Sequence, residues 1–294
     1  MSNNNTSGDR SLVTAWVKLI ISIVLSIVVV FSQMLGSTFA VMLNINPLLT
    51  TAIAYILPLI LAVALMIGLG GRKWMGIDKD SIKYAFKVGW IVLTIGALAS
   101  IFNIISSVNK GVTLSQDFAV NLIGAFLTCL MIGFYEEYLY RGISFGALLG
   151  VLGGSRFKIL LALLFAAWGF GRAHVTTLDF SNASVIIQAL LKIIQTGMLG
   201  IICSDCMLHS KKLGGAALLH AANDFLLMVT AAVFEGKTVT GKYTTDDPDQ
   251  GKMIMLVYGI MIVVYLYPTI RSFMRIWKEH EKCYGPFCKT YDQK

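Results

Sequence analysis

Ionisable side chains interrupt apolar stretches of this 294-residue sequence at three places. In the first, Glu136, Glu137 and Arg141 directly follow an apolar run. On a helix Glu137 and Arg141 lie four residues apart on one face and can pair, whereas Glu136 is turned about 100° aside. One carboxylate is then held and the other is available, which suits a general base acting on water. The structural alternative is a simple Glu–Arg ion pair.

The other two places each contain a histidine. Phe170 and His174 lie one turn apart near the end of a predicted helix, where a lone histidine is more often structural than catalytic. His220 and Asp224 are also one turn apart, with Asn223 beside them, and either bind each other or both face a shared cavity. Ionisable groups within membrane spans cost at least about 2.5 to 3.5 kcal/mol each, so these residues are functional candidates.

A turn signal at Gly153–Arg156 lies almost midway between Glu136 and His174. An antiparallel helical hairpin around this turn would bring the two side chains to a similar depth. His220 is harder to place, because a complete predicted span separates it from His174. Each histidine lies about seven residues from its nearest predicted turn, and these two turns lie at opposite ends of the intervening span. The two histidines are therefore predicted to lie at different depths. A tilt, a broken helix or a re-entrant loop at 175–183 would be needed to close this gap.

The composition predicts that these groups lie within a membrane. The chain is 56% hydrophobic and 14% charged, with a mean hydropathy of +0.73, which is outside the usual range of soluble domains. We therefore expect an all-α membrane protein, a polytopic bundle of about eight transmembrane helices with an intramembrane active site. The predicted spans are 13–43, 46–69, 88–107, 118–152, 158–178, 183–208, 213–234 and 253–270.

The cations are distributed unevenly over the loops between these spans. Alternate threading places 18 of the 24 Lys and Arg residues on one side, so the positive-inside rule predicts that both termini are cytoplasmic. We expect the membrane to be a bacterial cell membrane. The net charge of +8 is thus a topology signal, and no nucleic-acid motif accompanies it. The five cysteines are too few and too scattered for a secreted disulfide framework, and Cys283 and Cys288 signal a redox or metal role only weakly.

Three motifs taken together carry a family resemblance: E-E-x-x-x-R from Glu136, F-x-x-x-H from Phe170 and H-x-x-x-(N/D) from His220. In this order within apolar helices they resemble the CPBP family of intramembrane proteases. That family includes type II CAAX prenyl endopeptidases and bacterial bacteriocin-processing or immunity (Abi) proteins. The expected parts are N-terminal helices without a recognised motif at 1–117, a CPBP-like catalytic core at 118–235, and a last helix with a basic tail at 236–294.

The resemblance implies a role for each motif. Glu136 would activate the hydrolytic water with help from His174, and His220 with Asp224 would stabilise the tetrahedral oxyanion. The remaining pair, Glu137 and Arg141, would support these groups.

Asp224 departs from the pattern, because members commonly carry Asn at this position and an ionised aspartate repels an oxyanion. Either Asp224 is protonated, or Asn223 turns in as the donor, or the carboxylate binds a metal. We favour a glutamate mechanism without a cofactor. The alternative is a zinc site, with the ligands His174, His220, Glu136 and Asp224.

The predicted function is intramembrane hydrolysis of a peptide bond in a lipidated tail, a leader peptide or another membrane protein. One alternative is a catalytically silent member that binds a partner in bacteriocin immunity or signalling regulation. Another is a proton-coupled transporter, although the two halves of the chain show no repeat. The expected partners are a peptide or membrane-protein substrate and membrane lipids, without nucleic acid. Substrate identity and oligomeric state are not predicted.

Overall fold

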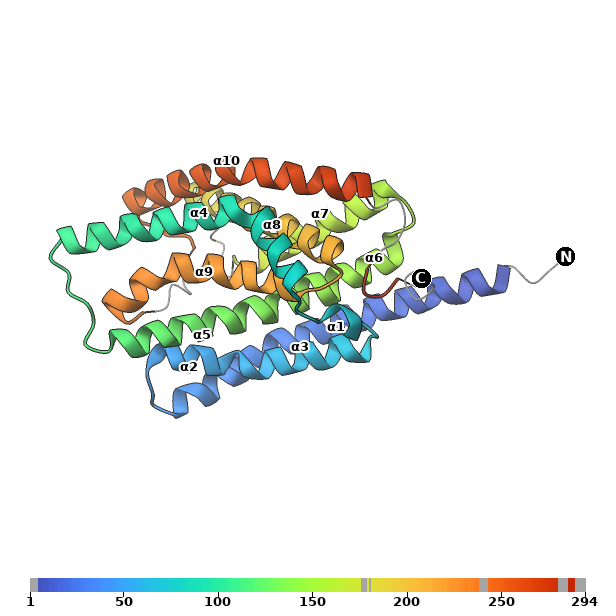
Figure 1. Cartoon of the computed structure of the whole chain (residues 1–294), viewed down its shortest axis with the longest axis horizontal. Helices are drawn as coiled ribbons and strands as arrows, with labels where there is room; N and C mark the ends of the chain where they lie inside the picture. Colours follow the sequence, from blue (N-terminus) through green and yellow to red (C-terminus); the bar gives the residue numbers. More distant parts are fainter. Residues whose placement is uncertain (1–4, 176–178, 180, 238–242, 280–284, 289–294) are drawn as a thin grey trace.

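The structure is a computed structural model that describes residues 5–175, 179, 181–237, 243–279 and 285–288. These residues form helices and no strand, and the long helices run side by side along one axis (Figure 1). The helices are α1 (Asn5–Met42), α2 (Pro47–Ala54), α3 (Ile56–Gly68), η1 (Arg72–Trp74), α4 (Lys79–Asn109), α5 (Phe118–Glu136), η2 (Glu137–Phe145), α6 (Gly146–Leu152), α7 (Arg156–Ala173), α8 (Ala183–Ser210), α9 (Gly214–Glu235) and α10 (Pro248–Glu279).

Seven helical segments of the described chain are long and apolar enough to cross a membrane. The predicted all-α, polytopic class is thereby confirmed. The remaining predicted span, 158–178, corresponds to α7, which packs against α8 but carries Arg156, Lys158 and Arg172 within its 18 residues. These three cations exclude α7 from the set of seven.

Two predicted spans are each divided in the structure. The span 46–69 breaks at Tyr55 into α2 and α3. Pro58 explains this break, because its nitrogen cannot donate to the carbonyl of Ala54, the last residue of α2. The span 118–152 consists of α5, the π-helix η2 and α6 in direct succession. Such π-helical insertions are rare and often mark functional sites.

The helix α4 begins nine residues before the predicted span of 88–107. Asp78 forms its N-cap and accepts a hydrogen bond from the Ser81 backbone at 2.7 Å, while the Ser81 hydroxyl accepts one from the Asp78 backbone at 3.1 Å. This reciprocal pair satisfies two backbone N–H groups at the start of the helix. A polar first turn extends the helix beyond the apolar stretch.

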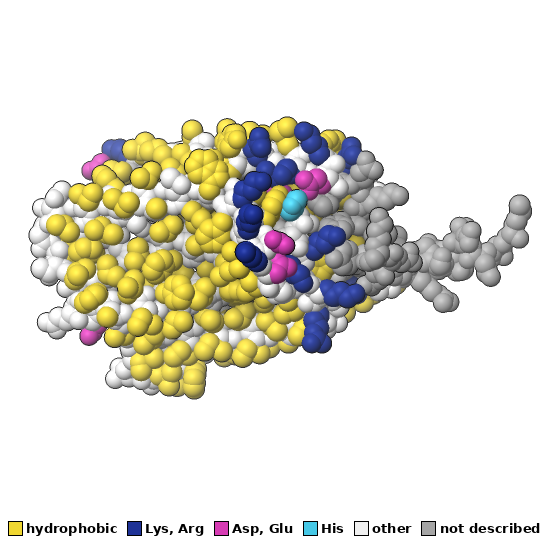
Figure 2. Space-filling view, viewed as in Figure 1, with side chains coloured by type: hydrophobic (Ala, Val, Ile, Leu, Met, Phe, Trp, Pro, Cys, Tyr) yellow, Lys and Arg dark blue, Asp and Glu magenta, His cyan; other side chains and the backbone are white. Residues whose placement is uncertain are grey.

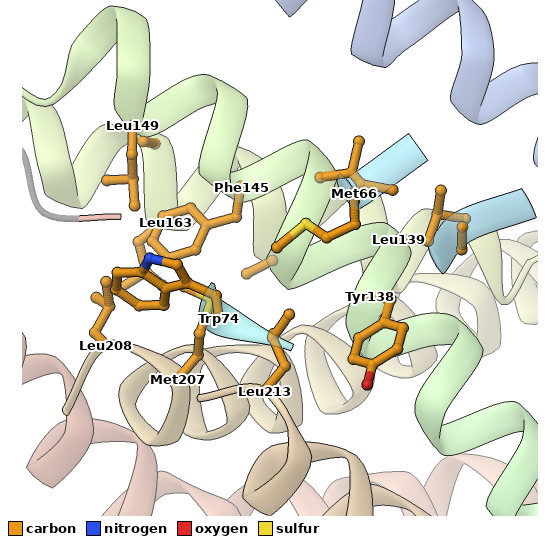
Figure 3. Close-up of a cluster of buried hydrophobic side chains, with 14 of the residues drawn as sticks. Met66, Trp74, Tyr138, Leu139, Phe145, Leu149, Leu163, Met207, Leu208 and Leu213 are labelled. Atoms are coloured by element: carbon orange, nitrogen blue, oxygen red, sulfur yellow. The ribbon is translucent and has the colours of Figure 1, made fainter. Parts of the chain in front are cut away.

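The helix α8 lies at the centre of the bundle. In the most apolar 18-residue stretch of α8, 61% of the residues are buried, whereas in the corresponding stretches of α1 and α10 only 17% are buried. The helices α1 and α10 present their apolar side chains outward. A cluster of buried side chains fills the space where η1, η2, α7 and α8 meet, including Trp74, Phe145, Leu163 and Met207 (Figure 3). This packing supports η2, the helix that carries the first motif.

Lys and Arg side chains gather at one end of the bundle, which we call the basic end. It contains η1, the turn between α6 and α7, and the turn between α8 and α9. Figure 2 shows them as a band beside an otherwise largely apolar face. An apolar body with a basic rim is the distribution expected of a protein that spans a bilayer.

Asp205 of α8 joins two neighbouring helices near the basic end. Its carboxylate accepts hydrogen bonds from the Arg275 guanidinium of α10 at 3.0 and 2.5 Å, and from the Tyr84 hydroxyl of α4 at 3.3 Å. The Asp205 side chain is buried by these partners. Asp205 therefore links α8 to α4 and α10 through hydrogen bonds.

Candidate active site

The π-helix η2 positions the ion pair that the sequence predicts. The Arg141 Nη1 atom lies 3.0 Å from Oε1 of Glu137, and both side chains are almost completely buried. The Arg141 guanidinium also lies over the ring of Phe170, 3.8 Å from its centroid, which favours a cation there. The aromatic residue of the second motif thus supports the charged pair of the first.

Glu136 differs from Glu137 in both accessibility and partners. Its side chain is 15% exposed, whereas that of Glu137 is 0% exposed. Oε2 of Glu136 has no hydrogen-bond partner within the described part of the chain. One carboxylate is therefore fixed by an arginine, and the other has a buried oxygen that is left free to form a hydrogen bond, as the spacing of the two residues predicts.

The second motif faces Glu136 across the α6–α7 turn. His174 Nε2 lies 3.8 Å from Glu136 Oε2, so the predicted hairpin does bring the two side chains to one depth. His174 Nδ1 lies 2.9 Å from the Phe170 carbonyl oxygen. Because a carbonyl only accepts, Nδ1 carries a hydrogen, so in the neutral ring Nε2 directs its lone pair toward Glu136.

His220 lies between the two glutamates. Its Nδ1 is 2.8 Å from Oε1 of Glu137, and its Nε2 is 3.7 Å from Oε2 of Glu136 and 3.5 Å from Oδ2 of Asp224. The Phe170 ring meets the His220 ring edge to face at 5.7 Å. All three motifs therefore converge on one place in the bundle.

The depth mismatch predicted for the two histidines does not occur, because α7 is shorter than the predicted span. It ends at Ala173, with His174 as its C-cap. Gly171 packs so closely on the Ile193 carbonyl that a Cβ there would overlap it, and Ile193 lies ten residues into α8. Ten helical residues span about 15 Å, so His174 lies well inside the bundle.

Gly133 explains how His220 comes so close to the glutamates. A Cβ at Gly133 would lie 2.6 Å from the Ala217 carbonyl and 2.9 Å from Ala221. Only glycine permits α5 and α9 to lie this close together. Gly133 lies one turn before Glu136, and the residues it contacts, Ala217 and Ala221, lie on either side of His220 in the sequence. The short distance between the helices carries the imidazole to the carboxylates.

Asn223 and Asp224 occupy different environments although they are adjacent. Asn223 is buried, and its Oδ1 accepts a hydrogen bond from the Tyr265 hydroxyl at 3.3 Å. Its Nδ2 donates to Asp224 Oδ1 at 3.4 Å. The Asp224 side chain is 24% exposed and presents its other oxygen to His220. The Asn223 amide thus contacts Tyr265 of α10 and the Asp224 carboxylate, whereas Asp224 faces the site through its oxygen near His220.

Tyr265 is a residue that sequence reasoning missed. It is fully buried on α10, and its hydroxyl donates a hydrogen bond to Oδ1 of Asn223 on α9 at 3.3 Å. No motif spacing links α10 to the three clusters, so only the packing of α10 against α8 reveals this contact. The geometry makes Tyr265 a positioning residue that orients the Asn223 amide.

Tyr265→Phe is expected to lower kcat about three- to tenfold with little change in KM, because loss of one buried hydrogen bond, about 0.5–1.5 kcal/mol, loosens Asn223 and Asp224. Initial rates in detergent would measure this effect. Tyr267→Phe is the matched control, because Tyr267 lies on the same helix and its side chain is exposed. An equal loss in both variants would contradict a positioning role for Tyr265.

The zinc alternative requires several ligands that converge on one point. Within the described ranges, no group of three or more His, Cys, Asp and Glu side chains has an arrangement that could hold a metal ion. Zinc ligation by His174, His220, Glu136 and Asp224 stays a prediction, and we derive no reaction step through zinc. As for the tail cysteines, Cys288 is disulfide-bonded, whereas Cys283 lies outside the described residues.

Comparison with known proteins gives one match. Residues 118–226 match the family model for Type II CAAX prenyl endopeptidase Rce1-like. This range runs from the start of α5 into α9 and contains every residue of the three motifs. No curated protein and no solved structure matches the chain. The match agrees with the resemblance to CPBP-family intramembrane proteases.

Proposed function

We propose that the chain is an intramembrane endopeptidase that uses a glutamate-activated water, because residues 118–226 match the family model for Type II CAAX prenyl endopeptidase Rce1-like and contain all three motifs. Its substrate would be a membrane-associated peptide, such as a lipidated tail, a leader peptide or a segment of another membrane protein. The observation that carries the proposal is the position of Glu136, whose Oε2 has no hydrogen-bond partner among the described residues and lies within 3.8 Å of two histidines.

Glu136 and His174 would hold the attacking water between them. Their facing atoms are 3.8 Å apart, and one water oxygen can lie at a hydrogen-bond distance of about 2.8 Å from both. Glu136 would take a proton as the water oxygen forms its bond to the substrate carbonyl carbon. The same proton would then pass to the leaving amide nitrogen as the C–N bond breaks, which returns Glu136 to its starting state.

His220 would stabilise the oxyanion of the tetrahedral intermediate. As an imidazolium it would donate through Nδ1 to Glu137 and through Nε2 toward the site, where Glu136 and Asp224 now lie 3.7 and 3.5 Å away. A fixed donor of this kind typically contributes a factor of about 10² to 10³ in kcat. Glu137 would keep the donor charged and oriented, and Arg141 would hold Glu137 in place.

Asp224→Asn is expected to raise kcat several-fold, because an amide that can donate would replace a carboxylate that repels the oxyanion when ionised. Stopped assays over a range of substrate concentrations would separate kcat from KM. Asp249→Asn is the matched control, since Asp249 is exposed at the start of α10. A loss of activity in Asp224→Asn alone would show that the carboxylate itself takes part in the reaction.

The proposed function can be tested with a quenched peptide library and with co-purifying membrane proteins, using protein reconstituted in liposomes. We expect the wild type to release defined fragments that Glu136→Ala does not release, and we expect cleavage to survive strong chelation. Identical product profiles for the two proteins would contradict the protease function. Loss of activity on chelation, with recovery on addition of zinc, would contradict the metal-free mechanism alone.

A further inference from the structure

A lysine approaches the site from the side of His174. Lys192 lies on α8, with its Nζ 4.2 Å from the centroid of the Tyr243 ring and 5.6 Å from that of Tyr258. The Nζ also donates a hydrogen bond to Oε1 of Gln195 at 3.2 Å. Its side chain is only partly exposed. The ammonium group is thus held in a defined place by two aromatic faces and one amide oxygen.

The aromatic wall beside Lys192 is itself fixed. Gln188 of α8 is fully buried, donates to the Thr245 carbonyl at 3.0 Å and accepts from the Thr245 backbone nitrogen at 2.9 Å. The Tyr258 hydroxyl of α10 donates to the Tyr243 carbonyl at 3.1 Å. These three hydrogen bonds secure the segment that carries Tyr243, so Lys192 faces a built surface.

This surface adjoins the catalytic groups. The Tyr243 ring centroid lies 6.0 Å from that of His174, so the ammonium is at most about 10 Å from the His174 ring. The carboxylates that act on Lys192 electrostatically are those of Asp224 and Glu136. The Lys192 ammonium therefore lies beside the site, on the side of Tyr243.

No Asp or Glu of the described chain lies within ion-pair distance of Lys192. Aromatic faces and an amide oxygen stabilise a cation without neutralising it, and charges within a membrane protein are normally paired. The two carboxylates that act on it belong to the proposed reaction machinery. A ligand that brings its own negative charge would complete the pairing.

We infer that Lys192, with Tyr243 and Gln195, forms a substrate subsite that binds a peptide carboxylate. The inference rests on the proposed function, since it places this carboxylate on the peptide to be cleaved. An extended peptide spans about 3.3–3.6 Å per residue, so the anion lies within about three residues of the scissile bond. It is either the C-terminal carboxylate or the side chain of Asp or Glu. Lys192 is then a specificity residue.

Direct binding tests the subsite without requiring turnover. The probe is a short N-acetylated apolar peptide in detergent micelles, prepared as the free acid and as the C-terminal amide. Titrated into Glu136→Gln, the acid is expected to bind at least about tenfold more tightly than the amide. Adding Lys192→Met should abolish this difference, whereas Lys192→Arg should retain most of it. A second series of C-terminally amidated peptides carries one Glu at successive positions. Tight binding of one of these peptides would show that the subsite binds a side-chain carboxylate and not the C-terminal one.

Lys252→Met in the same background is the matched control, because Lys252 is 72% exposed and pairs with Asp249. Equal binding of acid, amide and Glu-containing peptides to Glu136→Gln would overturn the subsite. A preference for the acid that survives Lys192→Met would overturn the assignment to Lys192. If the wild type binds the acid through Lys192 but cleaves no peptide, the subsite stands and the proposed protease function fails.

Discussion

Glu136→Gln is expected to lower kcat about 10²- to 10⁴-fold while KM and the unfolding temperature stay close to those of the wild type. Glutamine keeps the size of the side chain but cannot take a proton from water, and removal of a positioned general base typically has an effect of this size. Glu136 has no arginine partner and is not required for the Glu137–Arg141 ion pair. Single-turnover cleavage in liposomes would measure the chemical step separately from product release.

The effect of Glu136→Gln should be non-additive with that of His174→Gln. If both side chains act on one water, either substitution alone removes most of the activation, and the double variant should lose little more. Glu235→Gln provides the control for a change of charge at an exposed position. Independent losses that multiply in the double variant would contradict a shared water between these two side chains.

Arg141→Met is expected to destabilise the protein by about 3–5 kcal/mol, because it leaves the fully buried Glu137 carboxylate without its arginine. It also removes the cation that lies 3.8 Å from the Phe170 ring centroid. Equilibrium unfolding in mixed detergent micelles, followed by tryptophan fluorescence, would measure this loss. Lys158→Met, at the start of the neighbouring helix α7, controls for removal of a cation elsewhere.

A second variant separates stability from activity at this position. Glu137→Gln combined with Arg141→Met removes both charges, so much of the lost stability should return. Activity should remain low, because the amide oxygen of Gln accepts from His220 Nδ1 without the charge that favours an imidazolium. A double variant as unstable as Arg141→Met would show that packing on Phe170, rather than charge pairing, dominates. Restored activity would contradict the proposed role of Glu137.

The sequence by itself determined the class of the fold and much of the site. Long apolar stretches require helices in a bilayer, since no other open structure satisfies the backbone there. Residues four apart on a helix share a face, which is why the pairing of Glu137 with Arg141 followed from spacing. For the same reason His220 and Asp224 were expected either to bind each other or to face a shared cavity, and they lie 3.5 Å apart. The turn at Gly153 likewise predicted that Glu136 and His174 would meet.

Tertiary structure decided how the third motif joins the other two. Counting residues between predicted turns assumes that neighbouring helices end at the same depth. In the structure they do not, because the first ten residues of α8 extend about 15 Å past the end of α7. The approach of α5 and α9 at Gly133 depends on which faces of two distant helices pack together. Periodicity cannot specify such a pairing, because every apolar helix in a membrane protein has more than one face that could pack.

The same limit applies to the residues that surround the site. Tyr265 and Tyr243 belong to no motif, and their sequence neighbours give no sign that they reach the catalytic groups. Lys192 is an ionisable residue within the predicted span 183–208, but its aromatic partners lie on α10 and in the segment before it. Local spacing determines contacts within a helix, whereas contacts between helices are set by packing over the whole bundle.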